Sequence, residues 1–309
     1  MHLTLTLACG PDEILARVLK EQAPSIAPWL SSIFRHSYDT GAVPPDWNKT
    51  LVTAIRKKDS KSNPTNYRPI SLTSLCCKAM EHIILSHIAK HLAANNILID
   101  QQHGFRQRFS CETQLISAIS DWAKCINSRS QTDVILLDFS KAFDSVPHQR
   151  LLLKLDYYGI CGKTAAWIKA FLGNRSRVVS VNGTHSSPRP VPSGVPQGSV
   201  LGPVLFLLYI NDITDQIQST MRLFADDSIV YREIKNTCDH ALLQQDLASL
   251  CEWAETWQLN FNITKCYHFG ITNKVVPISY NCHMNDIVIA KSASTKYIGV
   301  TITHNLNWN

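Results

Sequence analysis

The segment DVILLD, residues 133–138, is the feature that most restricts how this chain can fold. Its apolar run, 134–137, is typical of a β-strand buried on both faces, and the run stops at the charged Asp138. Short strand-like segments of this kind alternate with amphipathic helical segments along the 309 residues. A chain of this length can also bury a substantial core, so the pattern predicts an α+β protein.

A second strand-like segment, RLFADDSIVY at residues 222–231, contains two neighbouring acids, Asp226 and Asp227. Apolar residues lead into and out of the pair, which predicts that it lies at or near the tip of a hairpin. Two adjacent carboxylates are costly to desolvate unless positive charge compensates them. No basic residue lies within several positions of the pair except Arg222.

Pairing of this hairpin with the strand that ends at Asp138 would bring three carboxylates together, although 88 residues separate Asp138 from Asp226. Carboxylate oxygens that leave coordination sites open favour Mg²⁺ over zinc. Two such ions about 4 Å apart can promote phosphoryl transfer. For the tripeptide ADD alone, the ordinary alternative is an Asp-Asp turn in a solvated hairpin.

Charge and cysteine usage limit the class of protein further. Lys and Arg number 30 against 24 Asp and Glu, a net charge of +6, and the stretch 49–68 alone carries +5. This stretch predicts a local anion-binding surface, with a solvated lysine-rich loop as the alternative. The ten cysteines form no C-x-x-C pair, which favours reduced thiols and an intracellular protein. The longest apolar run, 200–210, is too short to span a bilayer.

Hydrophobic periodicity and turn signals predict the main elements. We expect a hairpin turn at Asn182 and Gly183. We expect strands over 50–55 and 133–137, and helices over 11–21, 26–38, 74–93, 111–126, 200–213 and 238–257.

Eight stretches, in order and covering about residues 10–305, together resemble one known family. The chain resembles the reverse transcriptase domain of non-LTR (LINE-type) retrotransposons. The stretches that carry the resemblance are GPDEILARVLKE, NYRPISLTSLCCKAMEHII, QQHGFRQRFSCETQL, LLDFSKAFDSVPH, GVPQGSVLGPVLFLLYINDI, FADDSIVY, WQLNFNITKC and KYIGVTI.

The resemblance implies a right-hand polymerase with fingers and palm, whose antiparallel palm sheet packs on helices. Residues 1–40 would be an N-terminal helical extension and 41–128 the fingers. The palm would cover 129–309, with a return into the fingers at about 150–195. We expect neither an endonuclease nor a thumb, and hence weak binding of primer and template.

The resemblance also implies roles for individual residues. Asp138 and Asp226 match the metal-binding carboxylates, with the Phe139 carbonyl as a further ligand and Asp227 as the acidic neighbour. Phe143 matches the aromatic ring under the incoming sugar, where it would collide with a 2′-OH. Phe143 as a simple core residue is the alternative.

Further matched positions would bind the nucleotide and the primer. Gln197 and Gly198 match a loop against the nucleotide and template, and Lys265 matches a lysine proposed to protonate pyrophosphate. Ordinary turn, loop or edge-strand residues are the alternatives at these positions. The remaining matches are Lys57 or Lys58 with Arg68 for the triphosphate, and Tyr297 with Gly299 for the primer end. Ala54 and Asp59-Ser60 depart from the family's usual proline and glycine around the lysines, which leaves the choice between Lys57 and Lys58 open.

These matches imply an RNA-directed DNA polymerase that uses two Mg²⁺ ions, with Mn²⁺ as a substitute. Its partners would be an RNA template, a DNA primer and dNTPs, without a membrane. A nuclear location is compatible with such an element but is not encoded in a recognisable signal. The alternatives are a truncated or repurposed copy that binds nucleic acid without efficient polymerisation, and a palm that acts on another nucleotide substrate.

Overall fold

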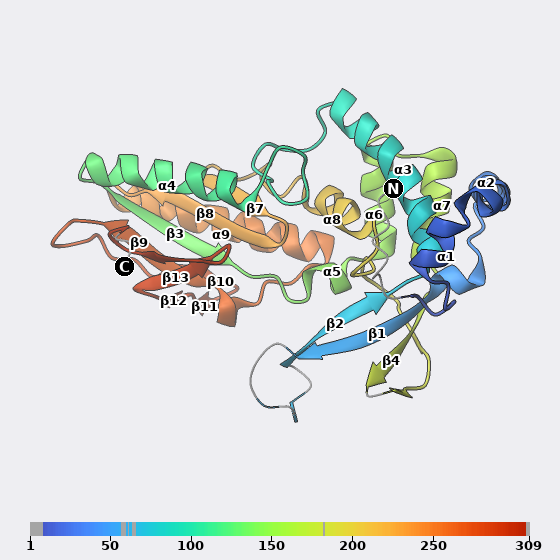
Figure 1. The fold of residues 1–309 in the computed structure, drawn as a ribbon. Coiled ribbons are helices and arrows are strands. Elements are labelled where there is room, and N and C mark those ends of the chain that lie inside the picture. Colours follow the sequence, from blue (N-terminus) through green and yellow to red (C-terminus); the bar gives the residue numbers. More distant parts are fainter. Residues whose placement is uncertain (1–8, 57–59, 61, 64–65, 182, 307–309) are drawn as a thin grey trace. The chain divides into compact units, whose positions relative to one another are not determined.

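The computed structural model describes residues 9–56, 60, 62–63, 66–181 and 183–306 (Figure 1). The chain divides into two compact units, each formed by two separate stretches. Unit 1 comprises Met1–Ile97 and Val146–Leu208, and unit 2 comprises Leu98–Ser145 and Tyr209–Asn309. Helices and sheets occur in both units, as an α+β protein requires. Among the helices of the described ranges, none has both the length and the apolar character needed to cross a bilayer.

Unit 1 contains a sheet in the order β2-β1-β4-β5, with the short β6 also paired to β4. β1 and β4 are parallel, and the other pairs are antiparallel. Its strands are β1 (Lys49–Arg56), β2 (Tyr67–Leu72), β4 (Ser176–Val181), β5 (Thr184–His185) and β6 (Arg189–Pro190). Its helices are α1 (Ala16–Glu21), α2 (Ala23–Thr40), η1 (Pro45–Asn48), α3 (Leu75–Ala94), α6 (His148–Tyr157), α7 (Gly162–Leu172) and the start of α8 (Gly202–Ile210).

Unit 2 is built on a sheet in the order β12-β9-β3-β8-β7, with two small hairpins, β10-β11 and β13-β14. The expected antiparallel pairing holds for β9, β3, β8 and β7, whereas the two-residue β12 is parallel to β9. The strands of the sheet are β3 (Gln131–Leu137), β7 (Thr220–Phe224), β8 (Asp227–Glu233), β9 (Tyr267–Thr272) and β12 (Ala290–Lys291). The remaining elements are α4 (Cys111–Asn127), α5 (Ala142–Ser145), α9 (Thr237–Trp257), η3 (Ile263–Lys265), β10 (His283–Met284), β11 (Ile287–Val288), β13 (Ser294–Tyr297) and β14 (Val300–Thr303).

The central strand β3 is buried on both faces, as its apolar run predicts. Val134 belongs to a core formed with Trp122 of α4 and with β8, β9, β13 and β14, and Figure 1 shows α4 running along the sheet. The opposite face of β3 meets α9, since Asp133 bonds to His240 of that helix. Helices therefore lie against both faces of β3.

Most helix boundaries follow the local sequence signals. Ser110 and Thr113 form a capping box at the start of α4, and Asn236 with Asp239 forms one at α9, so both helices begin within one residue of the expected position. The first helix begins at Ala16 instead of 11, because Glu13 has a φ of +54° and its N–H closes a turn onto Gly10. The expected turn at 182–183 includes Asn182, which lies outside the described residues; next to it Val181 pairs with Thr184.

Candidate active site

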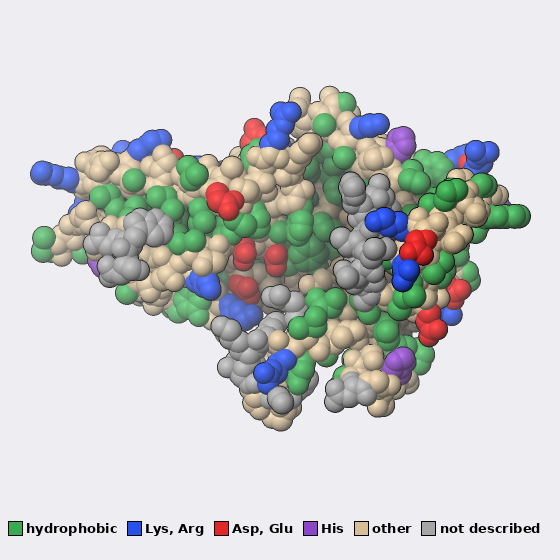
Figure 2. Space-filling view, viewed as in Figure 1, with side chains coloured by type: hydrophobic (Ala, Val, Ile, Leu, Met, Phe, Trp, Pro, Cys, Tyr) green, Lys and Arg blue, Asp and Glu red, His purple; other side chains and the backbone are tan. Residues whose placement is uncertain are grey.

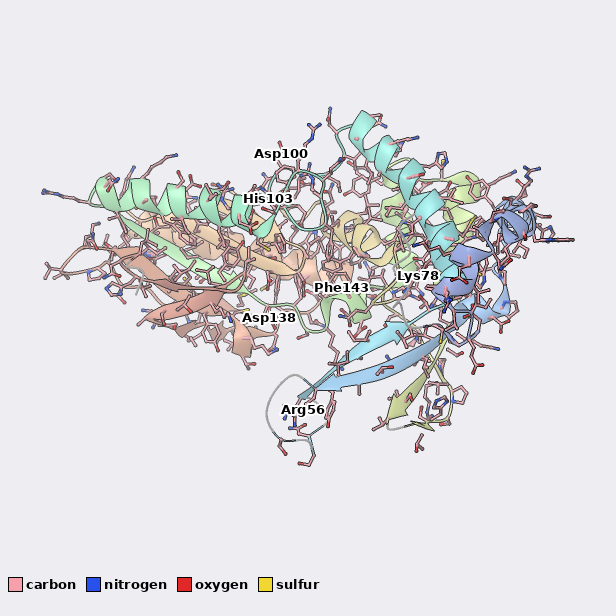
Figure 3. The ribbon with its side chains drawn as sticks, viewed as in Figure 1. Arg56, Lys78, Asp100, His103, Asp138 and Phe143 are labelled. Atoms are coloured by element: carbon pink, nitrogen blue, oxygen red, sulfur yellow. The ribbon has the colours of Figure 1, made fainter. Side chains whose placement is uncertain are left out.

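Strand register brings the three predicted acids to one end of the unit 2 sheet. Leu137 of β3 pairs with Ser228 of β8, and Phe224 pairs with Asp227 to close the β7-β8 hairpin. Ala225 and Asp226 therefore form the two-residue turn. Asp138 follows β3 directly, as Figure 3 shows, so it emerges beside the start of β8. The predicted hairpin position of the acid pair is confirmed.

The charge of Asp138 acts on the pKa values of both Asp226 and Asp227. Burial raises the pKa of Asp226, and the charge of Asp138 raises it further. Partial burial, followed by the charges of Asp226 and Asp138, raises the pKa of Asp227 to about 6. Figure 2 shows acidic side chains close to one another on the face it draws, with lysine or arginine side chains beside them. Carboxylates gathered in this way attract cations.

The nearest basic residue in sequence does not neutralise the pair, because Arg222 has another partner. Its Nη2 lies 2.7 Å from Oδ2 of Asp121 on α4, and its Nε donates to the Tyr231 hydroxyl at 2.6 Å. The Tyr231 hydroxyl in turn donates to the same Asp121 oxygen at 2.6 Å. This cluster links α4 to the hairpin strands and leaves the charges of Asp226 and Asp227 uncompensated by Arg222.

Asp138 is fixed through its backbone, while one of its side-chain oxygens lacks a hydrogen bond. Its carbonyl accepts from the Asn262 N–H at 2.7 Å, which ties the end of β3 to the loop before η3. Oδ2 is buried without a hydrogen-bond partner. Lys265 Nζ lies 3.7 Å from that oxygen, which is an ion-pair distance, and its side chain is 65% exposed. The structure therefore brings Lys265 to Asp138, whose Oδ2 has a cation at ion-pair distance but no hydrogen bond.

The two predicted aromatic positions lie just beyond Asp138. Phe139 is buried and its ring stacks on Phe261, with centroids 4.6 Å apart. Phe143 lies in α5 and meets the edge of Phe105 at 6.3 Å. Phe105 is 62% exposed, so this aromatic pair reaches the surface of unit 2.

The carboxylate oxygens of the acid cluster are ligands that hard cations prefer, but the side chains do not form a complete set of metal ligands. Among the described residues, no group of three or more His, Cys, Asp or Glu is arranged to hold a metal ion. The donor set nevertheless consists of carboxylates, one with an orphaned oxygen. Such a set fits Mg²⁺ completed by water and substrate oxygens.

The residues predicted to bind the triphosphate and to lie against the nucleotide and template belong to unit 1. Gln197 is exposed, and Gly198 has a φ of +99° with no space for a side chain, since a Cβ would lie 2.7 Å from the Ser71 carbonyl oxygen of β2. Arg68 lies in β2 opposite Ile55, and its side chain is outside the described residues. Lys57 and Lys58 are also outside them.

The predicted primer-grip residues lie in the β13-β14 hairpin. Tyr297 is 2% exposed, and its hydroxyl accepts from Gln114 Nε2 of α4 at 3.0 Å. Gly299, with Ile298, forms the turn, and both residues have positive φ. The Tyr297 side chain is thus part of the core, whereas Gly299 in the turn and Lys296 and Thr301 in the strands are exposed.

A comparison with known protein families identifies the family of this chain. Residues 55–302 match the family described as reverse transcriptase (RNA-dependent DNA polymerase). The chain therefore belongs to the reverse transcriptase family.

Among known reverse transcriptases, the chain is similar to proteins of transposons and other mobile elements. Three from Drosophila melanogaster are the probable RNA-directed DNA polymerase from transposon BS (27% identical over 99% of this chain), the RNA-directed DNA polymerase from mobile element jockey (28% over 99%) and the probable RNA-directed DNA polymerase from transposon X-element (28% over 98%). The chain spans about a third of their length, 35%, 34% and 34% respectively. It is a reverse transcriptase domain of the non-LTR retrotransposon type.

Proposed function

We propose that this chain catalyses RNA-directed DNA synthesis, in which a primer 3′-OH attacks the α-phosphate of a dNTP. The observation that carries the proposal is the strand register that places Asp138 beside the turn bearing Asp226 and Asp227. Three coupled carboxylates without compensation from Arg222 need a cationic partner to be ionised together. Family membership supplies the reaction class.

In this proposal Asp138 and Asp226 hold two Mg²⁺ ions, with the Phe139 carbonyl as a further ligand and Asp227 beside them. When bound, such a pair activates the attacking hydroxyl and stabilises charge on the phosphate and leaving group. Mn²⁺ would substitute, since it also favours oxygen ligands. Asp227, with a pKa of about 6, is ionised above that pH and adds to the attraction for cations.

Lys265 and Phe143 would act on the nucleotide. Lys265 is exposed and only ion-paired at 3.7 Å, so it can leave Asp138 and donate a proton to the pyrophosphate leaving group. The bulk of the Phe143 ring would exclude a 2′-OH and favour deoxynucleotides. The turn of the β13-β14 hairpin, including Gly299 next to Tyr297, would contact the primer end.

We assign unit 1 chiefly to the fingers and unit 2 to the palm. In this assignment residues 98–128 go with the palm, because Trp122 of α4 packs in the core of its sheet. Lys57 or Lys58 with Arg68 would bind the triphosphate, and Gln197 with Gly198 would lie against the nucleotide and template. The RNA template would be gripped through its backbone, so binding would weaken with salt.

The test is extension of a DNA primer on poly(rA) with dTTP and Mg²⁺, comparing the full chain with Asp226→Asn and Asp227→Asn. Asp286→Asn is the matched control, because Asp286 is an exposed acid of the same unit with a φ of +63°, a conformation that Asn tolerates. Extension by the parent and the control, but not by the two site variants, supports the proposal. Binding of a labelled RNA–DNA hybrid without extension by any of the proteins would favour a copy that binds nucleic acid without polymerising.

A further inference from the structure

The turn that carries Asp226 has an unfavourable backbone. Ala225, the first of its two central residues, has a φ of +54°, a conformation that glycine adopts readily and residues with a Cβ do not. Two-residue hairpin turns usually have glycine, asparagine or aspartate where φ is positive. Ala225 is also 6% exposed, so its backbone groups need partners inside the protein.

Those partners come from one side chain, Gln102, which is 123 residues earlier in the sequence. Its Oε1 accepts from the Ala225 N–H at 2.8 Å, and its Nε2 donates to the Ala225 carbonyl at 3.2 Å. The same Oε1 accepts from the Gly104 N–H at 2.7 Å. Gln102 is 2% exposed, so its amide holds both polar groups of the strained residue from within the protein.

The backbone around Gln102 is itself fixed against the hairpin. The His103 N–H donates to the Leu223 carbonyl at 2.8 Å, and the Leu223 N–H donates to the Gln101 carbonyl at 2.9 Å. A Cβ on Gly104 would lie 2.2 Å from the Ala225 nitrogen, so only glycine allows this approach. The segment 101–104 therefore runs beside the end of β7, joined to it by a single parallel bridge between Gln102 and Leu223.

Two further contacts hold this segment in unit 2. His103 Nδ1 lies 3.0 Å from the Thr113 hydroxyl in the first turn of α4. The Arg106 guanidinium donates to the Gln102 carbonyl at 3.2 Å and lies 4.5 Å from the centroid of the Phe109 ring. Between them, Phe105 contacts Phe143, so one short segment touches both the Asp226 turn and the aromatic proposed to select the sugar. Figure 3 labels His103, Asp138 and Phe143 in this region.

We propose that Gln102 is a positioning residue for the reaction: its amide clamps Ala225 and thereby sets where Asp226 stands relative to Asp138. This inference rests on the proposed function for its consequence in catalysis, but the clamp itself can be tested without activity. A reacting group that is misplaced by about 1 Å can lower a rate by about 100-fold. Loss of the hydrogen bonds from Gln102 should therefore lower kcat, because the chemical step requires Asp226 to be correctly placed relative to Asp138.

The variant is Gln102→Met, which keeps the length of the side chain and removes its hydrogen bonds. Gln101→Met is the matched control, since Gln101 is the adjacent, exposed glutamine. In the protein without metal, we expect amide hydrogen exchange at Ala225 to accelerate by about tenfold, the effect of one net hydrogen bond. In primer extension, we expect kcat to fall by about 100-fold and the Mg²⁺ concentration for half-maximal rate to rise. The KM for dTTP should change much less.

Rescue separates positioning from general destabilisation. Adding Ala225→Gly to Gln102→Met removes the need for the strained alanine and should recover part of kcat. Gly104→Ala, which keeps Gln102 but displaces the turn, should lower kcat in the same way and serves if Gln102→Met does not fold. Unchanged exchange at Ala225, or unchanged kcat with lowered thermal stability alone, would overturn the inference. If the parent protein extends no primer, the proposed function fails, while the exchange measurement still decides whether Gln102 clamps the turn.

Discussion

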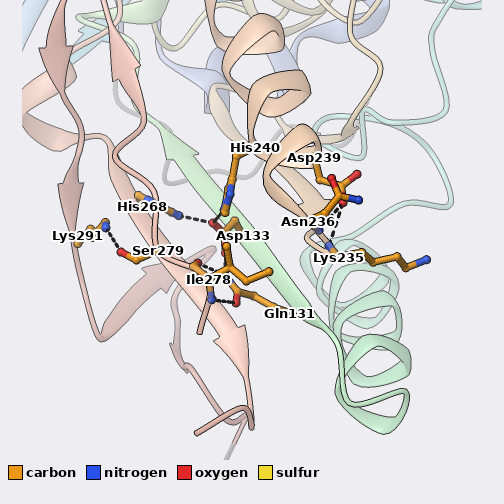
Figure 4. Close-up of polar contacts among 10 residues, drawn as sticks. All are labelled: Gln131, Asp133, Lys235, Asn236, Asp239, His240, His268, Ile278, Ser279 and Lys291. Carbon is orange, nitrogen blue, oxygen red and sulfur yellow. Dashed lines mark hydrogen bonds and ion pairs between the residues drawn. The ribbon is translucent and has the colours of Figure 1, made fainter. Parts of the chain in front are cut away.

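Replacing Asp133 by asparagine should destabilise unit 2 more than any exposed acid does. Asp133 lies on β3, is 1% exposed and accepts hydrogen bonds from three side chains (Figure 4). His240 Nε2 and His268 Nε2 lie 2.9 and 3.1 Å from its Oδ2, and Gln131 Nε2 lies 2.7 Å from its Oδ1. The carboxylate thus joins β3, β9 and α9 in the core.

Asparagine cannot reproduce these contacts, because it offers one acceptor oxygen and one donor NH₂ group. An NH₂ group at the position of Oδ1 would face the Gln131 donor, and one at the position of Oδ2 would face two imidazoles that both have to change tautomer before they can accept. Gln131 cannot flip without cost, since its own amide bonds to both the N–H and the carbonyl of Ile278. A hydrogen bond to a charged group contributes about 1.5–3 kcal/mol, so Asp133→Asn should cost about 3 kcal/mol. At 2–4 °C per kcal/mol, Tm should fall by about 10 °C.

The pH dependence adds a second signature. Burial alone raises the pKa of Asp133, but the hydrogen bonds from His268 and Gln131 outweigh it and the net pKa is below the usual 3.8. The folded state therefore binds fewer protons than the unfolded state, so this stabilisation is complete above 3.8 and is lost as pH falls through the lower folded pKa. The difference in stability between the parent and Asp133→Asn should shrink over that range.

The assay is thermal and urea unfolding of the full chain at about pH 7 and at pH values below 3.8, with Asp286→Asn as the exposed control. We expect a large loss for Asp133→Asn and almost none for Asp286→Asn. Equal Tm values for the two variants near neutral pH, or a difference that grows on acidification, would refute the account of Asp133.

Three further outcomes are expected. Asp227→Asn should abolish most extension yet raise Tm by about 2–4 °C in a metal-free scan above pH 6. The folded state raises the pKa of this carboxyl from 3.8 to about 6, so the carboxylate loses stability for the protein as pH rises through that range. A lowered Tm would contradict this sign. The buried Glu81 carboxyl, whose pKa is raised by burial, accepts hydrogen bonds from two backbone N–H groups at the start of α8. Glu81→Gln should therefore be nearly neutral in urea unfolding, whereas Glu81→Met should cost about 2–4 kcal/mol. Equal costs for the two variants would count against these hydrogen bonds as the cause. Gly198→Ala should raise the KM for dTTP more than Gly162→Ala does, because both have positive φ but a Cβ meets the Ser71 carbonyl only at Gly198; matching kinetics for the two would rule out the close contact as the cause.

Sequence patterns predicted the elements whose signals are local. The helices predicted over 74–93, 111–126 and 238–257 begin in the structure at side-chain caps formed by Ser74, Ser110 and Asn236. The apolar run before Asp138 identified the central strand, and the acids between two apolar runs identified the hairpin. Each of these signals lies within a few residues of the feature that it specifies, so no knowledge of distant contacts is needed.

Features that depend on distant partners were not predictable in this way. Asp133 stands at the edge of an apolar run, where a charge usually marks the end of burial, yet two histidines from other elements allow it to be buried. Gln102 lies in a stretch that contributed to the family resemblance but carries no local sign of a role. Tyr297 was predicted only as part of the hairpin at the primer end, and the burial of its ring beside Gln114 of α4 has no local signal in the sequence. In each case the partner is more than 100 residues away in the sequence.

The basic side chains nearest to Asp226 and Asp227 do not neutralise them. Arg222, the basic residue closest in sequence, is held by Asp121 and Tyr231, and Lys265 reaches Asp138 only at 3.7 Å. A fold that needed merely to neutralise the hairpin could have used either side chain directly. Instead the pKa of Asp227 stands at about 6 and a carboxylate oxygen of Asp138 has no hydrogen bond, so both are costly in the protein alone. That cost is explicable if divalent cations supply the missing charge during the reaction, which is why metal titration should shift the ionisation of Asp227 to lower pH.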